Sequence, residues 1–157
     1  MKKSIAVFPG TFDPFTKGHL SIVRKALPLF DQIIIGIGVN PEKRDFFPVE
    51  DRIQWIQNTF REEKKVKVET YDTLTVDFCK QHDAKYIIRG LRSNVDFDYE
   101  QQIALINKKL DPSVETVFLL TDPEYAALSS SFVREIYKYN RDISPFVPET
   151  VTIPSKQ

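Results

Sequence analysis

One histidine stands at the end of a turn-forming segment near the start of the chain. Residues 8–19 read FPGTFDPFTKGH, so His19 follows two prolines and two glycines that favour a tight turn. The periodic apolar residues after it predict a helix, which places His19 in the first helical turn. Peptide N–H groups and the helix dipole favour an anion at that position. We therefore expect the His19 ring to face an anionic ligand.

Two arginines, Arg89 and Arg92, stand in residues 88–92 (IRGLR), directly after a predicted strand. A guanidinium group forks onto phosphate oxygens, so a pair at this spacing suits two neighbouring phosphates. Surface salt bridges explain such a pair equally well when it is taken alone. Residues 96–102 (DFDYEQQ) follow within a predicted helix and complete this block.

A run of serines precedes an amphipathic segment in residues 128–135 (LSSSFVRE). One serine is enough to cap a helix, and Ser131 with Glu135 approximates a capping box. Three serines in a row at a strand-to-helix turn can also cradle a phosphate. Residues 40–44 (NPEKR) read as a solvated loop by themselves, but beside the other segments Lys43 becomes a candidate anion contact.

Other segments carry weaker signals. The sequence has no G-x-x-x-x-G-K-[ST], which excludes a P-loop. Gly36 and Gly38 follow a strand, but Pro41 occupies the place of the third glycine of a dinucleotide fingerprint. His82 is predicted to be a surface residue at a helix end, and Cys79 is predicted to pack within a helix.

Short apolar runs alternate with amphipathic segments, and this order must position the residues above. The predicted strands are 4–8, 32–39, 66–69, 86–88 and 114–120. Apolar residues recur at spacings of three and four after the first and second strands, and further helices are predicted at 96–110 and 131–139. The alternation predicts an α/β fold: a single-domain, Rossmann-like, doubly wound sheet of about five parallel strands with helices on both faces.

No linker or repeat divides residues 1–157, which predicts one domain, and the proline-containing residues 141–157 are expected to form a short C-terminal helix or tail. In an open α/β sheet the ligand crevice lies beyond the carboxyl ends of the strands. All of the segments singled out above fall at or just after those ends.

Composition limits the partners and the compartment. Lysines and arginines balance aspartates and glutamates, 22 against 22, so no overall field favours nucleic acid or an acidic membrane. The single cysteine fits a reducing compartment, and no apolar run is long enough for a signal peptide or a membrane span. We expect a cytoplasmic protein.

The four segments together resemble the phosphopantetheine adenylyltransferase family, within the H-x-G-H superfamily of nucleotidyltransferases. Thr16 replaces the first histidine, and this T-x-G-H variant is similar to that branch, whereas cytidylyltransferases usually keep the histidine. The resemblance runs from Ile5 to about Pro148, in order. It implies that the adenylyl group of ATP is transferred to 4′-phosphopantetheine, giving dephospho-coenzyme A and pyrophosphate, with the acceptor phosphate attacking directly in line.

The resemblance also implies residue roles. His19, Lys43 and Arg92 are expected to act in catalysis, with His19 donating to the α-phosphate. Acceptor contacts are expected from Thr11, Lys43, Leu74, Thr75 and Arg89, although family members often carry methionine at the position of Thr75. ATP contacts are expected from Thr11, Phe12, His19, Gly90, Leu91, Arg92, Glu100, Tyr125, Ala126, Ala127, Leu128, Ser129, Ser130 and Ser131.

Mg²⁺ is expected as the counter-ion of ATP rather than in a protein cage, because no carboxylate cluster is apparent. By the same resemblance, the chain is expected to form a homohexamer through a helix face at 95–110, and coenzyme A is a candidate feedback inhibitor. Two alternatives stay open: another small-molecule adenylyl- or cytidylyltransferase, acting on nicotinamide mononucleotide or glycerol phosphate, and a non-catalytic nucleotide sensor. A flavodoxin-like electron carrier would share the fold class but needs neither T-x-G-H nor the two arginines.

Overall fold

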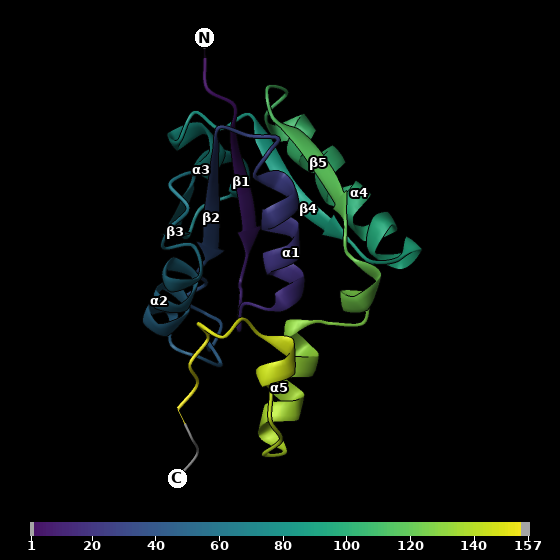
Figure 1. Cartoon of the computed structure of the whole chain (residues 1–157). Helices are drawn as coiled ribbons and strands as arrows, with labels where there is room; N and C mark the ends of the chain where they lie inside the picture. Colours follow the sequence, from purple (N-terminus) through teal and green to yellow (C-terminus); the bar gives the residue numbers. More distant parts are fainter. Residues whose placement is uncertain (1, 155–157) are drawn as a thin grey trace.

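A computed structural model of the chain describes residues 2–154, so residues 155–157 of the expected tail lie outside the described part (Figure 1). Its centre is a sheet of five parallel strands in the order β3-β2-β1-β4-β5, which confirms the predicted parallel sheet. The strands are β1 (Ile5–Gly10), β2 (Gln32–Gly38), β3 (Val66–Tyr71), β4 (Tyr86–Leu91) and β5 (Glu115–Leu120).

Helices cover both faces of this sheet, as predicted (Figure 1). The helices are α1 (Lys17–Ala26), α2 (Val49–Thr59), α3 (Thr75–Gln81), α4 (Asn94–Leu110) and α5 (Ser130–Lys138), with 3-10 turns η1 (Pro123–Tyr125) and η2 (Ser144–Phe146). Apolar residues of α1 and α2 share a core with one face of the sheet, and those of α3 share a core with the other. Cys79 is fully buried in that second core, as predicted.

The strand order reverses at the centre of the sheet, where β1 lies between β2 and β4. Pairing of β1 with β4 covers Ala6 with Tyr86 and Val7 with Ile87, whereas pairing with β2 continues to Gly10. Pro9 has no N–H to donate, which is one reason for β1 and β4 to separate there. In an open α/β sheet this reversal opens a crevice at the strand ends.

Two predicted boundaries near this crevice were wrong. β4 continues to Leu91, so Arg89 lies inside the strand rather than after it, because residues 89–91 pair in register with β5. Helix α5 begins at Ser130, and its N-cap is Ser129, whose hydroxyl accepts a hydrogen bond from the Phe132 N–H at 3.2 Å. Ser131 therefore lies within the first turn and cannot cap the helix.

A smaller apolar cluster holds α5 beyond the carboxyl ends of the strands, toward which the strand arrows point in Figure 1. Val133 of α5 packs there with Trp55 of α2 and with Ile143 and Val147 from the C-terminal segment. The serine run at the start of α5 is thereby brought to the end of the sheet that carries the crevice.

Candidate active site

Three cavities meet at the carboxyl ends of β1, β2 and β4. Their volumes are about 460, 360 and 710 Å³, and Thr11 lines all three of them. Arg89 and Glu100 line the first two, and Gly38 lines the second and third. We call them the histidine cavity, the tyrosine cavity and the lysine cavity, after His19, Tyr71 and Lys43 in their walls.

The histidine cavity brings together side chains that are far apart in the sequence. His19 of α1, Arg89 of β4 and Ser130 of α5 all line it. Most of the residues expected to contact ATP are also in its wall: Thr11, Phe12, Gly90, Arg92, Glu100, Leu128, Ser129 and Ser131. One pocket therefore contains an imidazole, two guanidinium groups and the start of a helix, which is an arrangement suited to a polyphosphate.

The orientation of His19 is set by the start of α1. The Thr16 N–H donates to His19 Nδ1 at 3.0 Å, and the Thr16 hydroxyl accepts from the His19 N–H at 3.3 Å. This is a reciprocal capping arrangement, and it occupies the lone pair of Nδ1. The proton of the neutral ring therefore lies on Nε2, which makes that nitrogen a hydrogen-bond donor.

The surroundings of His19 also keep it neutral. Its ring packs among the rings of Phe12 at 4.9 Å, Phe15 at 5.4 Å and Phe8 at 6.2 Å between centroids. Burial, followed by the charges of Arg89 and Arg92, lowers the pKa of His19 from 6.5 to about 3. At neutral pH the site thus offers an uncharged N–H donor beside two cations.

Arg89 is held in the wall between the histidine and tyrosine cavities. Its Nε and Nη2 donate to the two carboxylate oxygens of Glu100 at 2.7 and 2.6 Å, and Nη1 donates to the Pro9 carbonyl at 3.0 Å. Burial alone would lower the pKa of Arg89, but the hydrogen bonds and charge of Glu100 outweigh it and raise that pKa. Because a guanidinium has five N–H donors, two remain for ligands in either cavity.

Arg92 connects two walls of the histidine cavity. It pairs with Asp96 in the first turn of α4, with Nε 3.0 Å from Oδ2, and its Nη1 donates to the Leu128 carbonyl at 3.1 Å. Ser130 donates to the Pro14 carbonyl at 2.8 Å, which joins α5 to the turn before α1. These contacts hold the serine run and the β4–α4 loop against one pocket.

The wall of the tyrosine cavity combines apolar residues with hydroxyls, one amide and the Arg89–Glu100 pair. Tyr71 stacks on Phe78 with centroids 4.5 Å apart, and its hydroxyl lies 3.0 Å from the Thr75 hydroxyl. Burial raises the pKa of Tyr71, so the phenol stays protonated. Asn107 and Thr116 also line this cavity and add polar groups to it.

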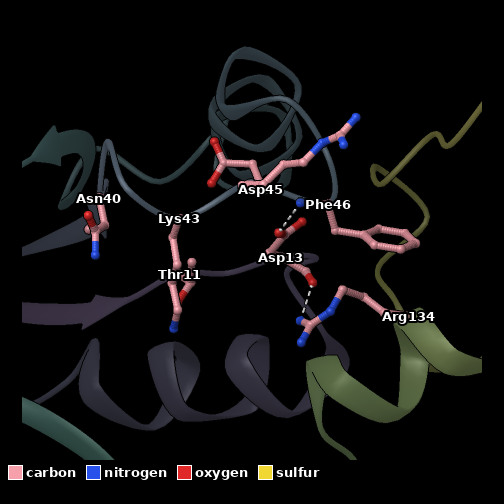
Figure 2. Close-up of a pocket in the computed structure, with 9 residues that line it drawn as sticks. Thr11, Asp13, Asn40, Lys43, Asp45, Phe46 and Arg134 are labelled. Carbon is pink, nitrogen blue, oxygen red and sulfur yellow. Dashed lines mark hydrogen bonds between the residues drawn. The ribbon is translucent and has the colours of Figure 1, made fainter.

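The lysine cavity carries positive charge (Figure 2). Lys43, Arg44 and Arg134 line it together with Asp13 and Asp45. Lys43 (Figure 2) lines this cavity together with Thr11, the residue that also lines the other two cavities. The residues after β2 thus bring a cation to the site, as expected.

Five predicted contacts do not line these cavities. Leu74 is 58% exposed at the start of α3, and Leu91 ends β4 outside the three cavity walls. Ala126 and Ala127 are exposed, and Tyr125 lines a separate surface pocket beside Lys17. Their roles stay predictions. His82 lies at the end of α3, as predicted, but it is half-buried and pairs with Glu69 at 3.0 Å.

Comparison with known proteins agrees with this geometry. A model of the cytidylyltransferase-like family matches residues 7–136. The phosphopantetheine adenylyltransferase of Bacteroides thetaiotaomicron is 51% identical over 94% of this chain and 97% of its own. Those of Bacteroides fragilis (50% identical; 92% of this chain, 95% of its own) and Leptospira biflexa (49%; 95% and 93%) are similar over nearly full length. The chain belongs to the phosphopantetheine adenylyltransferase family.

Several residues that build this phosphopantetheine adenylyltransferase site received no role from the sequence. Asp13 and Arg134 lie within the segments that resemble the family, but their residue types alone did not indicate what they contact. Arg52 is fully buried in α2 and donates to the Thr11 carbonyl, although arginine is rarely buried. Nothing local in the sequence marks it.

Proposed function

We propose that this chain reversibly transfers the adenylyl group of ATP to 4′-phosphopantetheine, producing dephospho-coenzyme A and pyrophosphate. The observation that carries the proposal is the meeting of three cavities at Thr11, in a chain about 50% identical to named phosphopantetheine adenylyltransferases. The histidine cavity would take ATP, and the tyrosine cavity would take the pantetheine arm. The acceptor phosphate would then lie near Thr11, Lys43 and Arg89.

The reaction is a direct displacement at the α-phosphorus of ATP. An oxygen of the acceptor phosphate bonds to that phosphorus while the bond to the oxygen bridging toward the β-phosphorus breaks, and this oxygen leaves with pyrophosphate. The acceptor phosphate is already ionised near neutral pH, so no activated serine or cysteine is needed. The protein must instead bring two anions together and stabilise charge in the transition state.

Each side chain contributes to one of these tasks. The neutral His19 Nε2–H would donate to the α-phosphate, and Lys43 and Arg89 would hold the attacking phosphate. Arg92 and the N–H groups at the start of α5, beside Ser130, would hold the β- and γ-phosphates. Thr11, which lines all three cavities, can contact both substrates with its hydroxyl.

Mg²⁺ is part of the proposal as the counter-ion of ATP. Within residues 2–154, no three His, Cys, Asp or Glu side chains gather as a cation cage. Phosphate oxygens and water would therefore hold the ion, as Mg²⁺ prefers. It would neutralise part of the triphosphate charge.

The decisive test is the identity of the products. The purified protein is incubated with ATP, Mg²⁺ and 4′-phosphopantetheine, and dephospho-coenzyme A is measured by mass spectrometry together with pyrophosphate. Parallel reactions contain nicotinamide mononucleotide, or glycerol 3-phosphate with CTP. We expect product with phosphopantetheine only. Turnover with another acceptor would favour a different nucleotidyltransferase, and tight ATP binding without pyrophosphate release would favour a nucleotide sensor.

Assembly, compartment and regulation belong to the same proposal. A homohexamer is supported by an unpartnered apolar stripe on α4, where Val95, Tyr99, Ile106 and Leu110 are each more than half exposed. No helix in residues 2–154 is long and apolar enough to cross a membrane, and we propose a cytoplasmic protein. Coenzyme A carries the pantetheine arm of the product, so it would inhibit by occupying the tyrosine cavity.

A further inference from the structure

We propose that Arg52 is a positioning residue which, together with Asp13, clasps two active-site loops into one unit. The first is the Thr11 loop, residues 11–16, and the second is the Lys43 loop, residues 39–48. The inference rests on the proposed function, since it assigns these loops to the acceptor phosphate. Neither Arg52 nor Asp13 needs to touch a substrate for this role.

Arg52 of α2 contacts both loops with its guanidinium group. Its Nη1 donates to the Thr11 carbonyl at 2.7 Å, and its Nε donates to the Phe47 carbonyl at 3.1 Å. Its Nη2 lies 2.9 Å from a carboxylate oxygen of Asp45, an ion pair that lacks the alignment of a hydrogen bond. One guanidinium thus contacts the Thr11 loop once and the Lys43 loop twice.

Asp13 connects the same two loops from the other side, because it lies in the Thr11 loop and binds the backbone of the Lys43 loop. Its two carboxylate oxygens accept hydrogen bonds from the N–H groups of Phe46 at 2.8 Å and Phe47 at 2.9 Å. Figure 2 shows the first of these bonds, and also the bond from Arg134 of α5 to the Asp13 carbonyl at 2.8 Å. Each loop is therefore held through its backbone by a charged residue from outside it.

The burial of Arg52 and Asp13 indicates that these two residues do more than stabilise the fold. Arg52 is fully buried and Asp13 is 6% exposed, and charged groups are costly to bury even when they are paired. Their side-chain hydrogen bonds to the two loops all go to backbone atoms, although apolar residues could pack the same space. What the contacts provide is a fixed distance between the Thr11 and Lys43 loops.

Lys43 depends on this fixed distance. Within residues 2–154 no acidic side chain pairs with Lys43, and its own N–H bonds only within the loop, to the Asn40 carbonyl at 3.0 Å. The ammonium group is therefore positioned by the loop as a whole. If the clasp is released, Lys43 and Thr11 should move apart, and the acceptor phosphate should lose its alignment with ATP.

The experiment compares Arg52→Lys with Ile56→Val, a conservative core substitution in the same helix that removes none of the hydrogen bonds between the clasp and the loops. Arg52→Lys keeps the charge but cannot reach three acceptors at once. We expect its kcat/KM for phosphopantetheine to fall roughly 10- to 100-fold, the range for a small misplacement of reacting groups. ATP affinity, measured by calorimetry, should change less than about threefold because the serine run and Arg92 hold the triphosphate. Ile56→Val should change neither quantity.

A second measurement does not require turnover. Amide hydrogen exchange at Phe46 and Phe47 reports the clasp directly, and we expect faster exchange there in Arg52→Lys and in Asp45→Asn, but not in Ile56→Val. Asp45→Asn removes a partly exposed partner and should leave the fold intact. Unchanged acceptor kinetics and unchanged exchange in both variants would overturn the inference. If the unaltered protein forms no dephospho-coenzyme A, the proposed function fails, and the exchange data still decide whether the clasp exists.

Discussion

At the scale of single residues, His19 shows how a neutral donor is obtained from a titratable side chain. The Thr16 N–H fixes the tautomer, while burial among aromatic rings and two nearby guanidinium groups oppose protonation. A charged imidazolium would attract the triphosphate more strongly in the ground state as well. In the proposed reaction, a neutral N–H would instead give a directed hydrogen bond that strengthens as charge builds on the α-phosphate.

Replacing His19 with alanine should therefore affect chemistry more than binding. We expect kcat to fall by roughly two to three orders of magnitude, the scale for one preorganised donor, with ATP affinity nearly unchanged. Steady-state kinetics and calorimetry measure the two effects. His82→Ala is the matched control, because His82 lies away from the three cavities, and it should retain full turnover. Near-normal turnover in His19→Ala would exclude the imidazole from the reaction.

The lowered pKa of His19 also predicts a pH-dependent stability. Below pH 6.5 the unfolded chain takes up a proton at His19, whereas the folded chain does so only near pH 3. The stabilising contribution is therefore complete above pH 6.5 and is lost as the pH falls toward 3, by up to about 1.4 kcal/mol per pH unit. The unfolding free energies of the wild-type protein and of His19→Gln are measured between pH 7 and pH 5. As the pH falls, we expect the wild-type protein to lose stability relative to the variant. A constant difference would contradict the assignment.

At the scale of elements, the site depends on how closely α3 packs against β2. A methyl group added to Gly36 would lie 2.9 Å from Cε1 of Phe78 and 3.0 Å from Cε1 of Tyr71. Phe78 is buried and its ring is stacked on that of Tyr71, so it cannot shift without disturbing this stack. The glycine is thus required by the close approach of a helix to a strand, two elements whose contact no local pattern reveals.

Gly36→Ala should destabilise the fold by about 1–3 kcal/mol through overpacking. Gly38→Ala, two residues along the same strand, is the control. Its added carbon would meet Tyr71 atoms at 3.8 Å, an ordinary contact, so its effect should be close to zero or slightly stabilising. Urea denaturation of both variants measures the difference. Equal stabilities would show that the Tyr71–Phe78 stack can yield at little cost.

At the scale of the whole molecule, α4 carries an apolar stripe that the described residues, 2–154, leave exposed. Val95, Tyr99, Ile106 and Leu110 fall on one side of the helix at helical spacing, with Val95 79% and Ile106 60% exposed. An exposed apolar stripe of this kind marks protein interfaces. It supports the proposed homohexamer, and the inner positions of the same helix, such as Glu100, face the site.

Ile106→Glu should dissociate the assembly, because it places a charge in the middle of the stripe. Native mass spectrometry or light scattering after size-exclusion chromatography should then find smaller species, whereas the unaltered protein should be hexameric. Leu29→Glu changes a similarly exposed leucine in the turn after α1 and should leave the mass unchanged. An unaltered mass for Ile106→Glu would assign the stripe another role.

Much of this architecture could be read from the sequence because it arises from local patterns. Apolar runs and helical spacing depend on residues close together in the chain, and they predicted the parallel sheet and the helices on both faces. The family-like segments predicted that His19, Arg89 and the serine run belong to one site, and the structure brings them into one cavity. The order of the segments along the chain was enough for this prediction, because the carboxyl ends of parallel strands lie at the same edge of the sheet.

Tertiary structure decided the partners of the side chains. Asp13 meets the Phe46 N–H 33 residues away, and Arg52 meets the Thr11 carbonyl 41 residues away, so neither bond leaves a periodic trace in the sequence. The pairing of β4 with β5 places Arg89 inside a strand. There it bonds to Glu100, although the sequence had assigned Arg89 to the acceptor and Glu100 to ATP. Side-chain identity and spacing specify which groups are available. Which of them meet depends on the packing of distant elements, a cooperative property of the folded chain.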